Sequence, residues 1–284
     1  MTVAALVLTA AVLMHVAWNL LARASHPDSR FLWWAVLGYL VVLGPWSLYE
    51  LATQAHWSLH LAGLLVTSAL SNGVYFIVLG AAYRRAPVAL VYPIARSSPL
   101  LIALWSSLLF GEIIPGMGWI GILVSVGGLL VMAFSAWHGE RRFVLLLAVT
   151  AAFATSVYSL SNKFAVASLP TYGTQLGLVS FDLIASFTAL SIEQRLHLGR
   201  WRPPTRPPIV RWLPAGLCIG NAYGLVIYAM QYLSAAYAVA FTNAGIVLAG
   251  LLSMFAFGER EHWGTRLGAI VLITCGLVIL GFSV

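Results

Sequence analysis

The chain has 284 residues, of which 61% are hydrophobic and only 8% are charged. A soluble domain carries about 25% charged residues, so this composition excludes a water-soluble globule and predicts an integral membrane protein whose main partner is the lipid bilayer. The formal net charge of +7 does not indicate a nucleic-acid partner, because loop arginines in membrane proteins set orientation.

Apolar segments of membrane-spanning length follow one another along the whole chain. A bilayer core of about 30 Å needs roughly 20 apolar residues per helix. Ten segments meet this need, at 2–22, 31–50, 58–82, 87–110, 116–136, 143–162, 173–194, 209–232, 236–257 and 264–283. The connections are short, except for the basic, proline-rich stretch 193–211, which predicts a solvated loop. The fold class predicted is an all-α integral membrane protein with ten transmembrane helices.

The two halves of the chain resemble each other. "LLFGEIIPGMGWIG" (108–121) aligns with "MFAFGEREHWGTRLG" (254–268), and "WNLLAR" (18–23) aligns with "YSLSNK" (158–163). Five helices per half is an odd number, so the second half must enter the membrane from the opposite side. The sequence therefore predicts a 5+5 inverted repeat, with boundaries at 1–138 and 139–284, which is an architecture of secondary transporters.

The basic residues predict the orientation. Thirteen of the fifteen Lys and Arg residues lie after the odd-numbered spans, and only Lys163 lies on the other side. By the positive-inside rule the odd loops are cytoplasmic. We therefore expect a multi-pass protein of the bacterial inner (plasma) membrane with both termini on the periplasmic, extracellular side.

One arginine lies within an apolar span. Arg96 is in "ALVYPIARSSPLLIAL" (89–104), with Pro93 and Pro99 on either side, where bends are expected. A charged residue inside a membrane normally faces the protein interior or a water-filled cavity. Its repeat equivalent is Asn243. Substrate binding by both residues is one interpretation; a structural ion pair or a side chain that reaches the cytoplasmic surface is the other.

Two titratable residues in the spans are candidates for coupling transport to protons. Asp182 is the only carboxylate near mid-membrane, and it could pair with Arg96, carry a proton or anchor a substrate amine. His15 shares one helix stripe with Trp18 and Asn19. A histidine can relay protons near neutral pH, or it can be a neutral residue bonded to the backbone.

Aromatic residues inside the spans are further binding candidates. Tyrosine and tryptophan prefer membrane interfaces, so interior ones indicate a lined cavity, although ordinary helix packing is the alternative. The candidates for substrate binding are Trp18, Asn19, Tyr75, Tyr92, Tyr158 and Tyr223, besides Arg96 and Asn243. Cys218 and Cys275 form no CxxC pair, and no phosphate-binding glycine loop occurs, so we expect no metal and no cofactor.

The chain resembles EamA-type transporters of the drug/metabolite transporter superfamily. The resemblance rests on the Phe-Gly-Glu at 110–112 and 257–259, the basic residue that closes the first helix of each half, and the stretch 89–112. It implies secondary active transport of a small polar or amphipathic, amino-acid-like metabolite by alternating access, with export as the favoured direction and no enzymatic activity. The alternatives are uptake of a quaternary ammonium or zwitterion such as choline, flipping of a lipid-linked anionic metabolite, and an intramembrane transferase. The oligomeric state stays open between monomer and homodimer.

Overall fold

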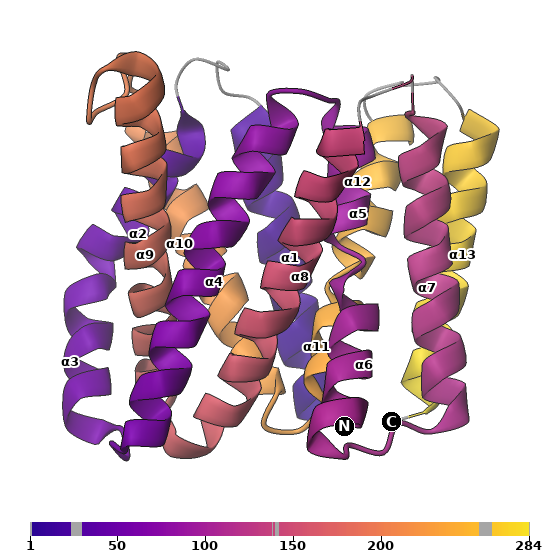
Figure 1. The fold of residues 1–284 in the computed structure, drawn as a ribbon, viewed down its shortest axis with the longest axis horizontal. Helices are drawn as coiled ribbons and strands as arrows, with labels where there is room; N and C mark the ends of the chain where they lie inside the picture. Colours follow the sequence, from indigo (N-terminus) through magenta and orange to yellow (C-terminus); the bar gives the residue numbers. More distant parts are fainter. Residues whose placement is uncertain (1, 24–29, 138, 140–141, 256–262, 284) are drawn as a thin grey trace. The chain divides into compact units, whose positions relative to one another are not determined.

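The computed structural model describes residues 2–23, 30–137, 139, 142–255 and 263–283. Every regular element in these ranges is a helix (Figure 1). The helices are α1 (Thr2–Arg23), α2 (Phe31–Val42), α3 (Gly44–Gln54), α4 (Leu59–Tyr83), α5 (Val88–Ala95), α6 (Ser98–Phe110), α7 (Gly116–Ser135), α8 (Arg142–Ala165) with the 3₁₀ turn η2 (Val166–Ser168), α9 (Tyr172–Leu198), α10 (Ile209–Ala229), α11 (Ala235–Phe241), α12 (Ala244–Phe255) and α13 (Trp263–Phe282).

The number of spans agrees with the sequence prediction. Within the described ranges, nine helical segments are long and apolar enough to cross a membrane, or ten when the pair α2 and α3, bent by 55°, counts as one span. The Phe-Gly-Glu at 257–259 lies outside the described residues.

Three predicted spans are interrupted rather than continuous. The breaks lie at Leu43 between α2 and α3, at Arg96 and Ser97 between α5 and α6, and at Thr242 and Asn243 between α11 and α12. Proline follows two of the breaks, as the second residue of α3 and of α6, a place where its missing N–H costs no hydrogen bond. The expected bends at Pro93 and Pro99 are thus replaced by one full break between them.

The chain folds into two compact units that each draw on both halves of the sequence. Unit 1 contains Val78–Leu160 and Leu233–Val284, and unit 2 contains Thr2–Ile77 and Ser161–Tyr232. The units therefore differ from the repeats at 1–138 and 139–284, which stay a prediction from sequence similarity.

In unit 1, α7 packs along α13 (Figure 1). Glycines make this approach close: a Cβ added to Gly121 would lie 2.9 Å from the Gly276 carbonyl oxygen, and one added to Gly128 would lie 2.9 Å from the Ala269 carbonyl oxygen. Membrane helices associate through such small residues, because lipid offers no hydrophobic drive for helix association. These two helices close the first and second halves of the chain respectively.

In unit 2, α10 packs against α1 and α2, and α9 packs against α2 and α3. The core is apolar and includes Tyr39, Leu61, Leu178 and Leu183. The buried Tyr39 hydroxyl donates to the Leu176 carbonyl over 3.3 Å, which satisfies its polar end.

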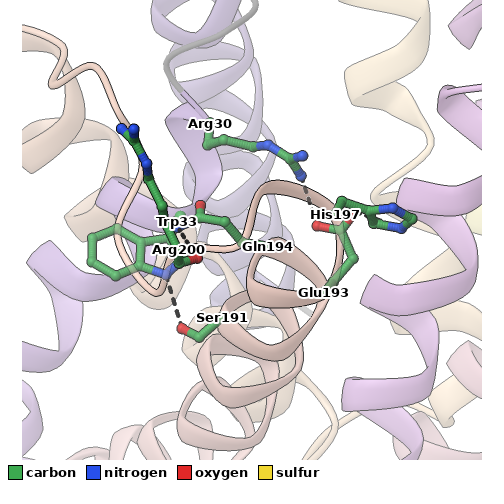
Figure 2. Close-up of polar contacts among 7 residues, drawn as sticks. All are labelled: Arg30, Trp33, Ser191, Glu193, Gln194, His197 and Arg200. Atoms are coloured by element: carbon green, nitrogen blue, oxygen red, sulfur yellow. Dashed lines mark hydrogen bonds and ion pairs between the residues drawn. The ribbon is translucent and has the colours of Figure 1, made fainter.

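Polar contacts fix the end of α9 (Figure 2). Arg30 Nη1 lies 2.6 Å from Glu193 Oε2, and Trp33 Nε1 donates to Ser191 Oγ over 2.9 Å. The prediction of a solvated loop from 193 is wrong for its first part, because α9 runs on to Leu198 and Glu193 is nearly buried.

The rest of that loop packs on aromatic rings. The guanidinium carbons of Arg202 and Arg206 lie 5.0 and 5.5 Å from the ring centre of Trp34, within the range of cation–π attraction. Lys163 lies in the last turn of α8, at the end of the first helix of the second half, as the match of "YSLSNK" with "WNLLAR" predicts. Its Nζ donates to the Met230 carbonyl oxygen over 2.5 Å.

Candidate functional site

The break between α5 and α6 meets the break between α11 and α12 inside unit 1. Asn243 Nδ2 donates to the Arg96 carbonyl oxygen over 3.4 Å. The contact joins two residues that the sequence repeat predicts to be equivalent. α11 also packs against α6, so the two interrupted helices touch where their backbones are irregular.

Local hydrogen bonds shape each break. Arg96 and Ser97 have ψ near zero, so they cannot continue the α-helix with ideal geometry. Ser97 Oγ donates to the Ile94 carbonyl over 2.7 Å, and Thr242 Oγ1 donates to the Val239 carbonyl over 2.6 Å. Each break is thus stabilised by a hydroxyl that caps a carbonyl of the preceding helix.

Polar groups at the two breaks lack partners within the part of the chain that the structure describes. Ser98 and Asn243 are buried, and neither Ser98 Oγ nor Asn243 Oδ1 has a hydrogen-bond partner there. A buried polar atom without a partner costs about 1–3 kcal/mol. Their place at the paired helix breaks makes this a candidate site for a ligand with polar groups.

Arg96 brings charge to this site. Its side chain is partly exposed, and its guanidinium carbon lies 5.5 Å from the ring centre of Tyr92 on α5. The structure therefore brings together Arg96, Tyr92 and Asn243, three of the predicted binding residues. A guanidinium beside an aromatic ring can bind a planar carboxylate in two-point geometry.

A second polar cluster lies in unit 2 around Asp182, which is fully buried. Asp182 Oδ2 accepts from Tyr223 Oη over 2.7 Å and lies 2.8 Å from Ser68 Oγ. Asn162 Nδ2 donates to Tyr223 Oη over 2.6 Å, and its Oδ1 lies 2.7 Å from Ser68 Oγ. The four side chains come from α4, α8, α9 and α10.

The cluster extends one layer further along α9. Ser186 Oγ lies 2.6 Å from Asn72 Oδ1 and 3.0 Å from the Asp182 carbonyl oxygen, and Asn72 Nδ2 lies 3.5 Å from Tyr223 Oη. Of this cluster only Asp182 and Tyr223 were predicted as site residues. Serine and asparagine in an apolar helix carry no special sequence signal, which is why Ser68, Asn162 and Ser186 were missed.

His15, Trp18 and Asn19 lie together on α1, as their spacing predicts. Trp18 Nε1 donates to His15 Nδ1 over 3.2 Å, and Asn19 Nδ2 donates to the His15 carbonyl over 2.6 Å. The indole N–H is only a donor, so His15 Nδ1 must carry no proton in this conformation. Protonation of that nitrogen would break the contact with Trp18.

Two predicted binding residues remain, Tyr75 and Tyr158. Tyr75 lies on α4 in unit 2 with its ring edge-on to Phe76, and Tyr158 lies on α8 in unit 1. Both are partly exposed. Arg96 and Asp182 belong to different units, and the pairing considered for them stays a prediction.

The irregular helices and intramembrane polar residues define a multi-pass α-helical membrane protein built like a transporter. The model of the EamA-like transporter family matches residues 1–134 and again residues 142–282. The chain belongs to the EamA-like transporter family.

Individual proteins are also similar to this chain, among them the following two. A protein of Synechocystis sp. described as an uncharacterized transporter is 35% identical over 83 residues, which is 27% of this chain and 25% of that protein. The match thus spans about a quarter of that relative's length. A crystal structure with 21% sequence identity superposes with a TM-score of 0.74, covering 98% of this chain and 97% of the other. The similarity to this crystal structure shows the fold of the chain.

Proposed function

We propose that this protein is a secondary active transporter of a small, amino-acid-like metabolite that carries a carboxylate or similar anion, and that it works by alternating access. The observation that carries the proposal is the meeting of two helix breaks at Arg96 and Asn243, where buried polar atoms have no partner among the described residues. Interrupted helices offer backbone and side-chain groups to substrates in many transporters. Export is the direction we propose, on the family resemblance alone.

The positive charge of Arg96 at the breaks distinguishes the proposed function from the alternative functions. Arg96 favours an anionic group and disfavours a quaternary ammonium, which would meet a like charge. A lipid-linked anionic metabolite satisfies the same charge and is the rival within the class. An intramembrane transferase would need a general base beside Arg96 to activate a hydroxyl nucleophile, and the amide, hydroxyl and phenol groups named at the breaks are not bases at neutral pH.

Equilibrium binding to the purified protein tests the substrate class. We expect a radiolabelled mixture of anionic and zwitterionic amino acids to bind, and labelled choline to bind much more weakly. The reverse preference would exclude Arg96 as the group that selects the substrate. Conversion of a bound compound into a product would instead support the transferase.

The orientation of the chain gives a separate prediction. Because thirteen basic residues follow odd-numbered spans, both termini should lie on the periplasmic side. A fluorescent protein that matures only in the cytoplasm, fused after Val284, should stay dark. Alkaline phosphatase at the same position should be active. A bright fusion with an inactive phosphatase would contradict the orientation.

A further inference from the structure

Four buried or half-buried side chains of unit 2 form a closed ring. In order around the ring they are Asp182, Ser68, Asn162 and Tyr223, joined by contacts of 2.8, 2.7, 2.6 and 2.7 Å. All four distances are those of strong hydrogen bonds. Ser68, Asn162 and Asp182 are buried, and only Tyr223 is partly exposed.

Each contact of the ring needs one hydrogen atom. The Ser68 and Tyr223 hydroxyls have one hydrogen each, and the amide nitrogen of Asn162 supplies one more toward the ring. Three hydrogens cannot fill four contacts. If the carboxyl of Asp182 is ionised, two oxygen atoms face each other at hydrogen-bond distance with no hydrogen between them.

The number of hydrogens that the ring needs is the same for both orientations of the Asn162 amide. With its oxygen toward Ser68, the hydrogens run from Asp182 to Ser68, to Asn162, to Tyr223 and back to Asp182. With the amide reversed, they run around the ring in the opposite sense. In both cases the fourth hydrogen must come from the Asp182 carboxyl. Asn72 also points its Nδ2 at Tyr223 Oη, at 3.5 Å, and the phenolic oxygen can accept this contact in either sense.

The other carboxyl oxygen supports a neutral Asp182. Asp182 Oδ1 is buried and has no hydrogen-bond partner within the described ranges. An ionised carboxylate with one oxygen unpaired in an apolar interior is far more costly than a neutral acid whose carbonyl is unpaired.

We propose that Asp182 is a proton-binding site, and that the bound proton closes a ring of hydrogen bonds through Ser68, Asn162 and Tyr223 that ties together α4, α8, α9 and α10. Binding adds a proton from water to the carboxylate, and release returns it to water. Tyr223, the partly exposed member, is the side of the ring from which the proton comes. The use of this proton to drive transport rests on the proposed function, whereas its binding does not.

Several other titratable or charged groups on the helices in and around the ring make contacts outside it. Tyr39 on α2 donates to the Leu176 carbonyl, and Glu50 on α3 accepts from Thr171 over 3.5 Å. Lys163 on α8 donates to the Met230 carbonyl, and Tyr172 on α9 donates to the Asn221 carbonyl. On α4, Tyr75 stacks edge-on with Phe76. The ring itself contains one second titratable group, Tyr223.

Carbon-13 NMR of the aspartate carboxyl groups tests the proposal in the full-length protein. The chain has two aspartates, Asp28 and Asp182, so Asp28→Asn leaves one labelled carboxyl. We expect its chemical shift to be that of a neutral acid at pH 7 and to move to that of a carboxylate only at higher pH. A carboxylate shift already at pH 6 would overturn the proposal, whatever the protein transports.

Asn162→Leu distinguishes the ring from a simple effect of burial. Without the Asn162 amide, only the contacts of Asp182 with Ser68 and with Tyr223 remain. The two hydroxyl hydrogens are enough for both contacts, so a proton on Asp182 is no longer needed. We expect proton binding to weaken about tenfold, or about one pH unit, which is the scale of one hydrogen bond. If burial alone held the proton, the more apolar leucine would strengthen binding, and a stronger or unchanged affinity would contradict the ring.

Ser180→Ala is the matched control. Ser180 is buried on α9 near Asp182 but bonds to Ser47 over 2.7 Å, outside the ring. Loss of the Ser180 hydroxyl should leave the titration of Asp182 unchanged. If Asn162→Leu does not fold, the wild-type titration with Asp28→Asn still decides whether Asp182 holds a proton.

Discussion

Arg96→Ala is expected to abolish transport while the protein still inserts into the membrane and purifies as a single species. Arg96 supplies the positive charge at the meeting of the two helix breaks: its guanidinium lies over the Tyr92 ring, and its backbone carbonyl accepts from Asn243. Alanine leaves the substrate's anion without its charged partner. Transport into proteoliposomes and size-exclusion profiles measure the two parts of this result. Arg85→Ala, an exposed arginine of the same unit, should transport normally.

A conservative change refines the test. Arg96→Lys keeps the charge but loses the planar, two-point donor geometry. The loss of a charge-assisted hydrogen bond is worth roughly 1.5–3 kcal/mol, which corresponds to about ten- to a hundred-fold in affinity. We expect weaker apparent affinity with normal yield. Equal affinity of the lysine variant would mean that Arg96 acts only as a diffuse charge.

An ion pair between Arg96 and Asp182 is the competing account of the arginine. It predicts that Arg96→Ala expresses poorly, because an unpaired buried carboxylate is costly. It also predicts that adding Asp182→Asn restores both yield and transport. Recovery of transport in that double variant would rule out Arg96 as a substrate ligand.

Asp182→Asn is expected to remove the pH dependence of transport. A neutral amide of nearly the same size cannot bind or release a proton, so the ring with Ser68, Asn162 and Tyr223 can no longer change state with pH. In the wild type, the ring is closed at low pH and loses its fourth hydrogen as the pH rises through the titration of Asp182. Initial rates measured across pH in proteoliposomes should therefore vary for the wild type and stay flat for the variant.

His15 provides the matched comparison. Its Nδ1 already accepts from Trp18, and His15→Gln should keep the pH dependence if Asp182 is the coupling group. Loss of the dependence in His15→Gln, with an unchanged profile in Asp182→Asn, would move the coupling site to α1 and leave Asp182 with a structural role.

The sequence predicted the parts of this molecule that depend on local pattern. The spans follow from runs of apolar residues, and the correspondence of Arg96 with Asn243 follows from the repeat; the structure joins these two residues by a hydrogen bond. The polar stripe of His15, Trp18 and Asn19 also follows from the period of a helix.

The rest depends on packing between distant segments. No local signal shows that Ser68, Asn162, Asp182 and Tyr223 converge, because they lie on four different helices that are distant in the sequence. The break at Arg96 was expected as proline bends, but its twin at Thr242 and Asn243 has no proline. The helical continuation to Leu198 was missed because its charged residues resemble a loop, although Glu193 is paired with Arg30.

Counterflow in proteoliposomes tests the central claim, secondary transport, most directly. Vesicles that contain the purified protein are loaded with an excess of an unlabelled amino acid that the protein binds, and are then diluted into a trace of the same compound in labelled form. We expect transient accumulation of label inside the vesicles without ATP, and none with Arg96→Ala. Binding without accumulation, or label recovered as a chemically altered product, would contradict the account.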